Sequence, residues 1–253
     1  MPPSPSTPST PETPTPVTDR PALGRADEPL PQGEAKVRAV RSMFDAIAPR
    51  YDLVNRVMTF GLDVAWRRRT VRDLGLPAGS VVLDLASGTG DLCAELARQG
   101  LRPAGFDLSL GMLQAARRPH PRVQADVLRL PVPDGRADGA VCGFALRNLV
   151  ELPAFFAELA RVLRPGGRIG LLEVAEPDNA VLRKGHQLYF GSVVPRIGGL
   201  LSDGDAYRYL PRSVAYLPPP VELVDLLRRA GFVQVRRELL TLGAAQLLTA
   251  TRA

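Results

Sequence analysis

The amino-acid sequence predicts an α/β protein with a mainly parallel sheet and helices on both faces. Strand-like and helix-like segments alternate between residues 80 and 174, and a glycine-rich turn follows the first strand. Such alternation is typical of parallel sheets, because a helix returns the chain to the edge where the next strand starts. Two strand-like segments close the chain without a helix between them, which predicts an antiparallel pair.

Each element follows from a local pattern. Apolar runs predict strands over 80–85, 102–108, 122–126, 137–144 and 168–174, and the terminal pair over 232–239 and 244–252. The first intervening helix, 92–100, closes at Gly100, and the second, 110–118, is capped by Ser109. The third helix spans 153–164, and Gly166 and Gly167 turn it into the next strand. Residues 34–75 predict two or three short helices, and about 178–230 a mostly helical stretch.

Composition divides the chain into a tail and one domain. Residues 1–33 hold ten of the 25 prolines, with serine and threonine between them, and offer too little apolar surface to offset the entropy of ordering. We therefore expect a disordered tail over 1–33 and one folded domain over 34–253. Neither a secretory signal nor a run of eighteen apolar residues is present, so the expected location is the cytoplasm.

The net charge of +6 comes almost entirely from arginine. A basic motif interleaved with aromatic residues, as in RNA-binding modules, is missing, so we expect no nucleic-acid partner. The favoured explanation of the charge is a GC-rich genome that encodes its positive charges as arginine. Two cysteines and two histidines lie far apart in sequence, so no metal site is expected.

The ends of the predicted strands indicate the ligand. Asp84, Asp107 and Asp126 stand at three successive strand ends, where open parallel sheets bind ligands. A dinucleotide is disfavoured, because Asp91 would repel a pyrophosphate at the start of the helix, and no Lys-Ser/Thr pair marks a P-loop. S-adenosylmethionine, which is cationic and lacks phosphate, suits this acidic rim. Asp107 is placed for the ribose hydroxyls and Asp126 for the adenine amino group.

Five ordered motifs resemble one family. They are "MFDAIAPRYDLVNRVMTFGLDVAW", "VLDLASGTGDL", "GFALRNL", "RVLRPGGRIGLLEV" and "AYRYLPRSV". Over about residues 38–248 the chain resembles the class I S-adenosylmethionine-dependent methyltransferases, and within them the ubiquinone/menaquinone biosynthesis C-methyltransferases. The resemblance implies a Rossmann-like fold with a seven-stranded sheet. It also implies an enzyme that methylates a ring carbon of a prenylated hydroquinone, in the first instance demethylmenaquinol.

Site residues follow from the same resemblance. The cofactor set it implies is Asp84, Ala86, Ser87, Gly88, Thr89, Gly90, Asp107, Leu108, Met112, Asp126, Val127, Gly143 and Phe144. Tyr207 and Arg208 are expected to bind the acceptor. Some positions depart from the family pattern: Asp63 replaces a histidine, Gly143 a serine, and "LGAAQLL" lacks the usual tail histidine. These departures leave the acceptor less defined than the chemistry.

The expected mechanism explains a charge at the end of an apolar run. Arg147 would stabilise the phenolate of the acceptor, Asn148 would assist by hydrogen bonding, and Tyr51 or a water would relay the proton. The alternative role for Arg147 is a structural ion pair with an acid such as Glu151.

Three kinds of partner are expected. The first is the hydroquinone. The second is the membrane surface at the inner face of the cell membrane, met through residues 66–72 and 183–201. A homodimer is also allowed. Demethoxyubiquinone methylation, a methyltransferase of secondary metabolism with a changed acceptor pocket, and a non-catalytic cofactor-binding module are the alternative functions.

Overall fold

The computed structural model describes residues 31–189, 192, 194, 196, 209 and 212–253. The predicted tail therefore lies almost wholly outside the described residues. The first helix, α1 (Gly33–Ile47), begins at the predicted domain boundary, and Tyr216 donates a hydrogen bond to the carbonyl oxygen of Pro31 just before it.

A seven-stranded sheet forms the centre of the fold, with the strand order β3-β2-β1-β4-β5-β7-β6. Its strands are β1 (Val81–Leu85), β2 (Arg102–Asp107), β3 (Arg122–Gln124), β4 (Ala137–Gly143), β5 (Leu163–Val174), β6 (Phe232–Leu240) and β7 (Ala245–Arg252). β7 runs antiparallel to both of its neighbours, β5 and β6, while the pairs among β1 to β5 are parallel. The predicted sheet, with its antiparallel pair at the C-terminal end, is confirmed.

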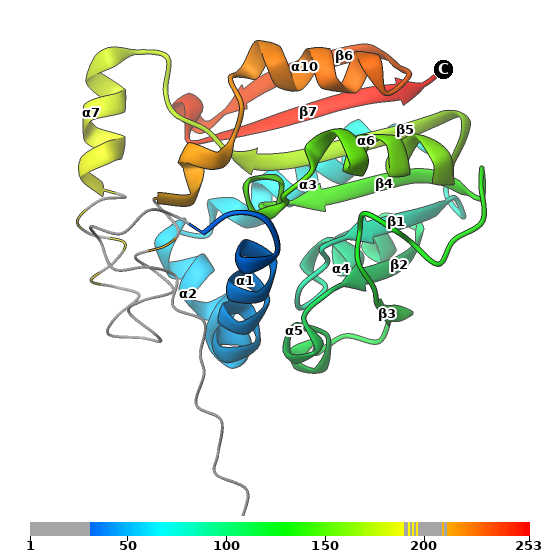
Figure 1. Cartoon of the computed structure of the whole chain (residues 1–253), viewed down its shortest axis with the longest axis horizontal. Helices are drawn as coiled ribbons and strands as arrows, with labels where there is room; N and C mark the ends of the chain where they lie inside the picture. Colours follow the sequence, from blue (N-terminus) through cyan, green and yellow to red (C-terminus); the bar gives the residue numbers. More distant parts are fainter. Residues whose placement is uncertain (1–30, 190–191, 193, 195, 197–208, 210–211) are drawn as a thin grey trace, which may run out of the picture.

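Helices cover both faces of the sheet (Figure 1). One face packs α6 (Leu152–Val162) and α10 (Pro220–Arg229) against strands β1, β4 and β5, in a core that includes Phe155 and Leu227. The other face packs α3 (Leu62–Asp73) and α4 (Asp91–Arg98) through Val71 and Leu96. Along β1, Leu83 and Leu85 belong to the first core and Val82 to the second, and this alternation fixes the register of the strand.

Two boundaries differ from the sequence prediction. α5 (Leu110–Ala115) is shorter than the expected helix over 110–118. The chain also leaves α6 at Val162 rather than residue 164, because Leu163 adopts an extended conformation and pairs with Ala137 at the start of β4. Strand pairing thus overrides the local helical pattern.

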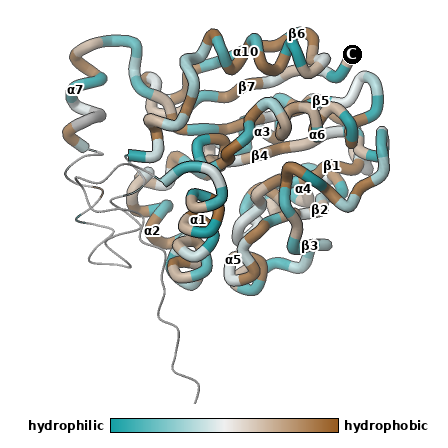
Figure 2. Tube along the Cα trace, viewed as in Figure 1, coloured by the Kyte–Doolittle hydropathy of each residue, from teal (hydrophilic) through white to brown (hydrophobic). Residues whose placement is uncertain are grey.

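Several short elements lie beyond the carboxyl ends of the central strands (Figure 1). They are α1, η1 (Ala48–Arg50), α2 (Tyr51–Met58), η2 (Leu146–Asn148), α7 (Ala180–Leu188), η4 (Val214–Tyr216) and η5 (Thr241–Gly243). Both hydrophilic and hydrophobic residues alternate along α1, α2 and α7 (Figure 2), as in helices with one packed face. Among the described residues, no helix is long and apolar enough to cross a membrane.

Candidate active site

The loop after β1 holds an unusual backbone. Gly88 and Gly90 have φ angles of 56° and 86°, and Ala86 has a φ of 53°, which L-residues rarely adopt. A side chain at position 90 would collide with the ring of His120. Glycine adopts these angles without strain, whereas at Ala86 the conformation costs about 1–3 kcal/mol, and such strained residues concentrate at functional sites.

Asp84 lies behind this loop. Its carboxyl group is 1% exposed, and Oδ2 accepts a hydrogen bond from the backbone nitrogen of Cys93 at 3.0 Å, in the first turn of α4. Burial raises the pKa of Asp84 to about 7, and Oδ1 has no hydrogen-bond partner among the described residues. Asp84 therefore supports the loop from inside the protein.

A first cavity of about 130 Å³ opens at the carboxyl ends of β1, β2 and β4. Nine of the residues predicted for the cofactor line it: Ala86, Gly88, Asp107, Leu108, Met112, Asp126, Val127, Gly143 and Phe144. We call it the cofactor cavity. These residues come from four separate loops, which the parallel topology brings to one edge of the sheet.

Two carboxylates of the cofactor cavity are already organised by backbone groups. Asp107 accepts hydrogen bonds from the nitrogens of Gly88 and Ser109, each at 2.8 Å, and Asp126 accepts one from the nitrogen of Leu128 at 2.9 Å. Burial raises the pKa of Asp107, while these backbone bonds oppose the rise. Each carboxylate oxygen retains a lone pair for a ligand hydroxyl.

Four predicted cofactor residues do not line this cavity: Asp84, Ser87, Thr89 and Gly90. Thr89 instead donates a hydrogen bond of 2.5 Å to Asp52 of α2, which ties that helix to the glycine loop. Ser87 packs against Gly105 of β2, where a side chain would approach its Oγ to 2.9 Å. These residues shape the loop that borders the cavity.

Helix α1 covers the cofactor cavity, a role that the sequence analysis did not assign. Val37, Val40, Arg41 and Phe44 all line the cavity. Asp45, near the end of α1, accepts hydrogen bonds from Ser109 Oγ at 2.5 Å and from the nitrogen of Gly111 at 2.9 Å. The amphipathic pattern of residues 33–47, placed directly before the "YDLVN" motif, is the signal that pointed to a covering helix.

Lys36 anchors the N-terminal end of α1 by hydrogen bonds. Its Nζ donates to the carbonyl oxygens of Arg147 and Leu149, each at 2.9 Å, and lies 3.6 Å from the centre of the Tyr216 ring. Burial lowers the pKa of Lys36 to about 8. α1 is thus held at both ends against the loops that form the cavity.

The loop after β4 forms one wall of the cofactor cavity, next to a second cavity described below. Phe144 adopts a φ of 60° and is anchored by its nitrogen to the carbonyl oxygen of Leu172 at 2.7 Å. At Gly143, a Cβ atom would approach Leu92 Cδ1 to 2.9 Å, so glycine leaves room where the family pattern has serine.

A second, larger cavity of about 450 Å³ adjoins the first, and we call it the acceptor cavity. Its walls are mostly apolar, from α2, α3, α7 and the β4 loop, with polar side chains from Asn55, Thr59, Asp63, Arg67 and Arg147. Tyr51 and Phe144 line both cavities. These two residues therefore mark the place where a group held in one cavity meets a group held in the other.

Arg147 lines the acceptor cavity and is 5% exposed. Its Nη1 forms an ion pair with Glu173, which is 0% exposed, and donates to the carbonyl oxygen of Phe144 at 2.7 Å. Its Nε donates to Ser213 Oγ at 3.0 Å. The acid beside Arg147 is Glu173 of β5, not Glu151. A lone acid in the apolar run 169–174 was the signal for it.

The other predicted catalytic residues lie at the boundary or on the cofactor side. Burial raises the pKa of Tyr51, opposed by the charge of Arg67, a hydrogen bond with Asn55 and the charge of Arg147. Asn148 lines the cofactor cavity and accepts a hydrogen bond from the Tyr209 hydroxyl at 3.2 Å. Tyr207 and Arg208, predicted for the acceptor, lie outside the described residues.

Comparison with known proteins agrees with this geometry. The model of the ubiE/COQ5 methyltransferase family matches residues 32–252. The chain belongs to this family. It is 44% identical over 214 residues to demethylmenaquinone methyltransferase of Thermus thermophilus, covering 80% of this chain and 96% of the relative. It is 41% identical over 224 residues to the ubiquinone/menaquinone biosynthesis C-methyltransferase UbiE of Syntrophotalea carbinolica, covering 84% and 93%.

Solved structures show the same fold at low sequence identity. Phosphoethanolamine N-methyltransferase 2 of Haemonchus contortus, in complex with S-adenosylhomocysteine, aligns with a TM-score of 0.60 at 13% identity. The alignment covers 84% of this chain and 59% of that one. This family member is an S-adenosylmethionine-dependent methyltransferase with a Rossmann-like fold.

Proposed function

We propose that this methyltransferase transfers a methyl group from S-adenosylmethionine to a ring carbon of a prenylated hydroquinone, with demethylmenaquinol as its acceptor. The observation that supports this most is the pair of cavities that share Tyr51 and Phe144. One holds strand-end carboxylates, and the other is apolar with a buried arginine. Two curated relatives named for quinone biosynthesis support the choice of acceptor.

The cofactor cavity fits S-adenosylmethionine. Asp107 would accept the ribose hydroxyls and Asp126 would face the adenine, while the open space beside Gly88 lets the backbone approach the methionine part. Bound there, the cofactor supplies a methyl group on a positively charged sulfur. α1 would exclude water from the cavity, because its apolar residues and Arg41 form one wall.

In the acceptor cavity, Arg147 would favour ionisation of the ring hydroxyl. A phenol-like hydroxyl has a pKa near ~10, so the ring carbon next to it becomes nucleophilic only when a fixed cation stabilises the oxyanion. Glu173 does not line the cavity, so the ion pair presents its positive end to the acceptor. The pair is held rigidly by Ser213 and the Phe144 carbonyl, which is the preorganisation that this type of catalysis needs.

Tyr51 would act as a hydrogen-bond donor at the meeting point of the two cavities. Because burial raises the pKa of its hydroxyl, Tyr51 stays protonated at neutral pH and is a poor proton acceptor. We therefore assign removal of the hydroxyl proton of the acceptor to a water molecule rather than to this side chain. Asn148, held by Tyr209, would fix the cofactor side of the same boundary.

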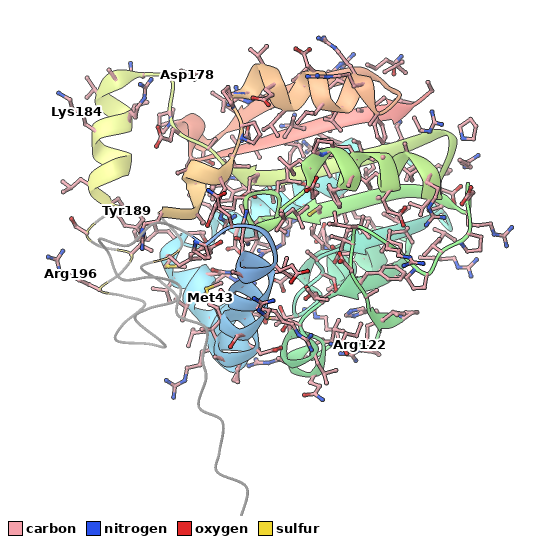
Figure 3. All side chains as sticks on the ribbon, viewed as in Figure 1. Met43, Arg122, Asp178, Lys184, Tyr189 and Arg196 are labelled. Atoms are coloured by element: carbon pink, nitrogen blue, oxygen red, sulfur yellow. The ribbon has the colours of Figure 1, made fainter. Side chains whose placement is uncertain are left out.

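The prenyl chain would leave the acceptor cavity through an apolar mouth. Phe60, Leu62, Val181 and Leu182 line the cavity and are also 77%, 38%, 78% and 40% exposed. Phe60 has a φ of 52° and packs its ring 5.7 Å from that of Tyr189. Lys184 and Arg196 lie at the same outer edge of the molecule (Figure 3). We propose that this edge contacts the membrane surface that holds the prenyl chain.

Part of the membrane-contact surface that the sequence predicts is buried or engaged in ion pairs. Of residues 66–72, Trp66, Arg67, Thr70 and Val71 are buried, and Arg69 pairs with Asp73 and Glu238. About half of residues 183–201 lies outside the described residues. The membrane contact that we propose therefore centres on the mouth of the cavity.

Val181 and Val221 provide a matched test of this contact. Each is the second residue of a helix and is 78% or 74% exposed, but only Val181 lines the acceptor cavity. We expect Val181→Ser to reduce co-sedimentation with phosphatidylglycerol vesicles several-fold and Val221→Ser to leave it unchanged. Equal effects of the two substitutions would contradict the assignment of this edge.

Turnover with defined acceptors tests the function itself. Purified protein should convert demethylmenaquinol in detergent, under reducing conditions, to a product heavier by one methylene, detected by mass spectrometry. The methyl group should be found on the ring carbon rather than on oxygen. Failure to methylate this hydroquinol, while S-adenosylmethionine binds in calorimetry, would rule out the proposed acceptor.

A further inference from the structure

A second buried arginine faces the acceptor cavity. Arg67, on α3, is 7% exposed and lines the cavity. Its Nη1 pairs with Asp63, one helical turn earlier, and lies 3.4 Å from Asp91 Oδ2. Among the residues that the structure describes, neither Nε nor Nη2 of Arg67 has a hydrogen-bond partner. Unused N–H groups of a charged side chain in a cavity wall can donate to an oxygen atom of a ligand.

Arg147, which also lines the acceptor cavity, shows the same arrangement. Its Nη2 also lacks a hydrogen-bond partner within the described part of the chain, and a carboxylate lies behind its Nη1. Both guanidinium groups act electrostatically on Tyr51, at the boundary of the two cavities. Two charged donor groups from different elements therefore converge on one cavity.

Aromatic rings lie next to Arg67. Its guanidinium carbon lies over the Phe144 ring, 5.6 Å from the ring centre, and the Trp66 ring centre lies 6.2 Å from that of Phe144. Because Phe144 lines both cavities, Arg67 lies beside the place where they meet. Asp63 is itself fixed, since it accepts a hydrogen bond from Thr59 Oγ1 at 2.8 Å, so Arg67 is held in position before the acceptor arrives.

We propose that Arg67 donates hydrogen bonds to the second ring oxygen of the hydroquinone, the one para to the oxygen stabilised by Arg147. This inference rests on the proposed function. Holding both oxygens fixes the ring axis that joins them, and so keeps the unsubstituted carbon beside the ionised oxygen near the methyl group. Arg67 is on this basis a residue that binds and orients the acceptor.

The test combines a substitution of Arg67 with an acceptor that lacks one hydroxyl group. The two acceptors are prenylated 1,4-naphthalenediol and the prenylated 1-naphthol that lacks the hydroxyl remote from the methylated carbon. Wild-type kcat/KM should fall roughly 10- to 100-fold on the naphthol, because one hydrogen bond to a charged donor is lost. The kcat/KM of Arg67→Met on the diol should be lower than that of the wild type by a similar factor, and it should fall little further on the naphthol. If the two losses multiply instead, Arg67 does not contact this oxygen.

Arg69 supplies the matched control. It lies on the same helix but pairs with Asp73 and Glu238 and does not line the acceptor cavity. Arg69→Met should keep wild-type discrimination between the two acceptors, and loss of discrimination in this variant would contradict the inference.

Two further measurements keep the result interpretable. Arg67→Met removes the nearest cation from Asp63, which keeps Arg56 Nε at 3.8 Å and the hydrogen bond from Thr59. Arg67→Lys, which retains the charge, serves if the first variant does not fold. The lysine variant should discriminate less between diol and naphthol than the wild type, and unchanged discrimination would refute the role. Absence of wild-type turnover on the diol would refute the proposed function, whereas multiplied losses with normal wild-type turnover refute only the assignment of Arg67.

Discussion

Replacing Arg147 should affect both stability and chemistry, and the structure allows the two effects to be separated. The side chains of Arg147 and Glu173 are 6% and 0% exposed, so removing one leaves the other as a buried, unpaired charge. Breaking a buried pair costs about 3–5 kcal/mol. At roughly 2–4 °C per kcal/mol for a domain of this size, Arg147→Ala should melt about 6–20 °C lower than the wild type.

Glu173→Gln provides the comparison. Glu173 also accepts hydrogen bonds from the nitrogens of Arg147 at 3.2 Å and Val174 at 2.8 Å, which an amide satisfies only in part. We expect its melting temperature to fall by a similar amount. Its turnover should stay within a few-fold, because the guanidinium group that faces the acceptor is retained.

Turnover, measured at a temperature where all variants are folded, then reports the chemistry. Arg147→Ala should lose roughly 10²–10³ in turnover, the usual effect of removing one oxyanion donor. The turnover of Arg147→Lys should lie between those of the wild type and the alanine variant, since lysine keeps the charge but not the planar guanidinium group. Activity of the alanine variant should recover partly toward pH ~10, where the hydroquinone ionises unaided. Equal losses of turnover in Arg147→Ala and Glu173→Gln would refute the catalytic role and leave only the structural ion pair.

Three other substitutions test the cofactor side. Asp107→Asn should weaken S-adenosylmethionine binding at least ~10-fold in calorimetry, because a charge-assisted hydrogen bond to the ribose is lost; unchanged affinity would remove Asp107 from the site. Asp45→Ala should weaken binding about 3- to 10-fold and speed cofactor release in stopped-flow measurements, because α1 loses its bonds to Ser109 and Gly111. The pKa of Asp84 rises on folding from 3.8 to about 7, so the folded state holds an extra proton between these two values. Wild-type stability therefore falls as pH rises from about 4 to 7 and levels off above 7. Asp84→Asn should therefore gain about 3 kcal/mol relative to the wild type between pH 5 and pH 8 in urea unfolding, and a pH-independent difference would contradict the buried, protonated state.

Much of the cofactor site was predictable from sequence because it depends on local patterns. Parallel strands place their carboxyl ends at one edge, so carboxylates at successive strand ends had to lie near each other. Nine of the predicted cofactor residues line one cavity for this reason. Ala86 in the glycine loop has a φ of 53°, a left-handed conformation that glycine adopts without strain.

The sequence did not show which predicted residues face the cavity and which lie behind it. Asp84 lies one residue before the end of β1 and Asp107 is the last residue of β2, and the register of the two strands places both on the same face of the sheet. Asp84 accepts a hydrogen bond from Cys93 of α4, whereas Asp107 lines the cavity. The period of two along a strand does not distinguish them, because the difference depends on how far α4 extends over that face.

By itself, the sequence determined the mainly parallel sheet with its terminal antiparallel pair, the glycine loop and the carboxylates at the strand ends. Each of these depends on residues close together in the chain or on the rules of parallel sheets. Only the tertiary structure decided that Arg147 pairs with Glu173, that α1 covers the cofactor cavity, and that Arg67 shares the acceptor cavity with Arg147. Each of these contacts joins elements that are distant in sequence. Their partners are set by how helices and loops pack beyond the sheet, which periodicity and local propensity do not encode.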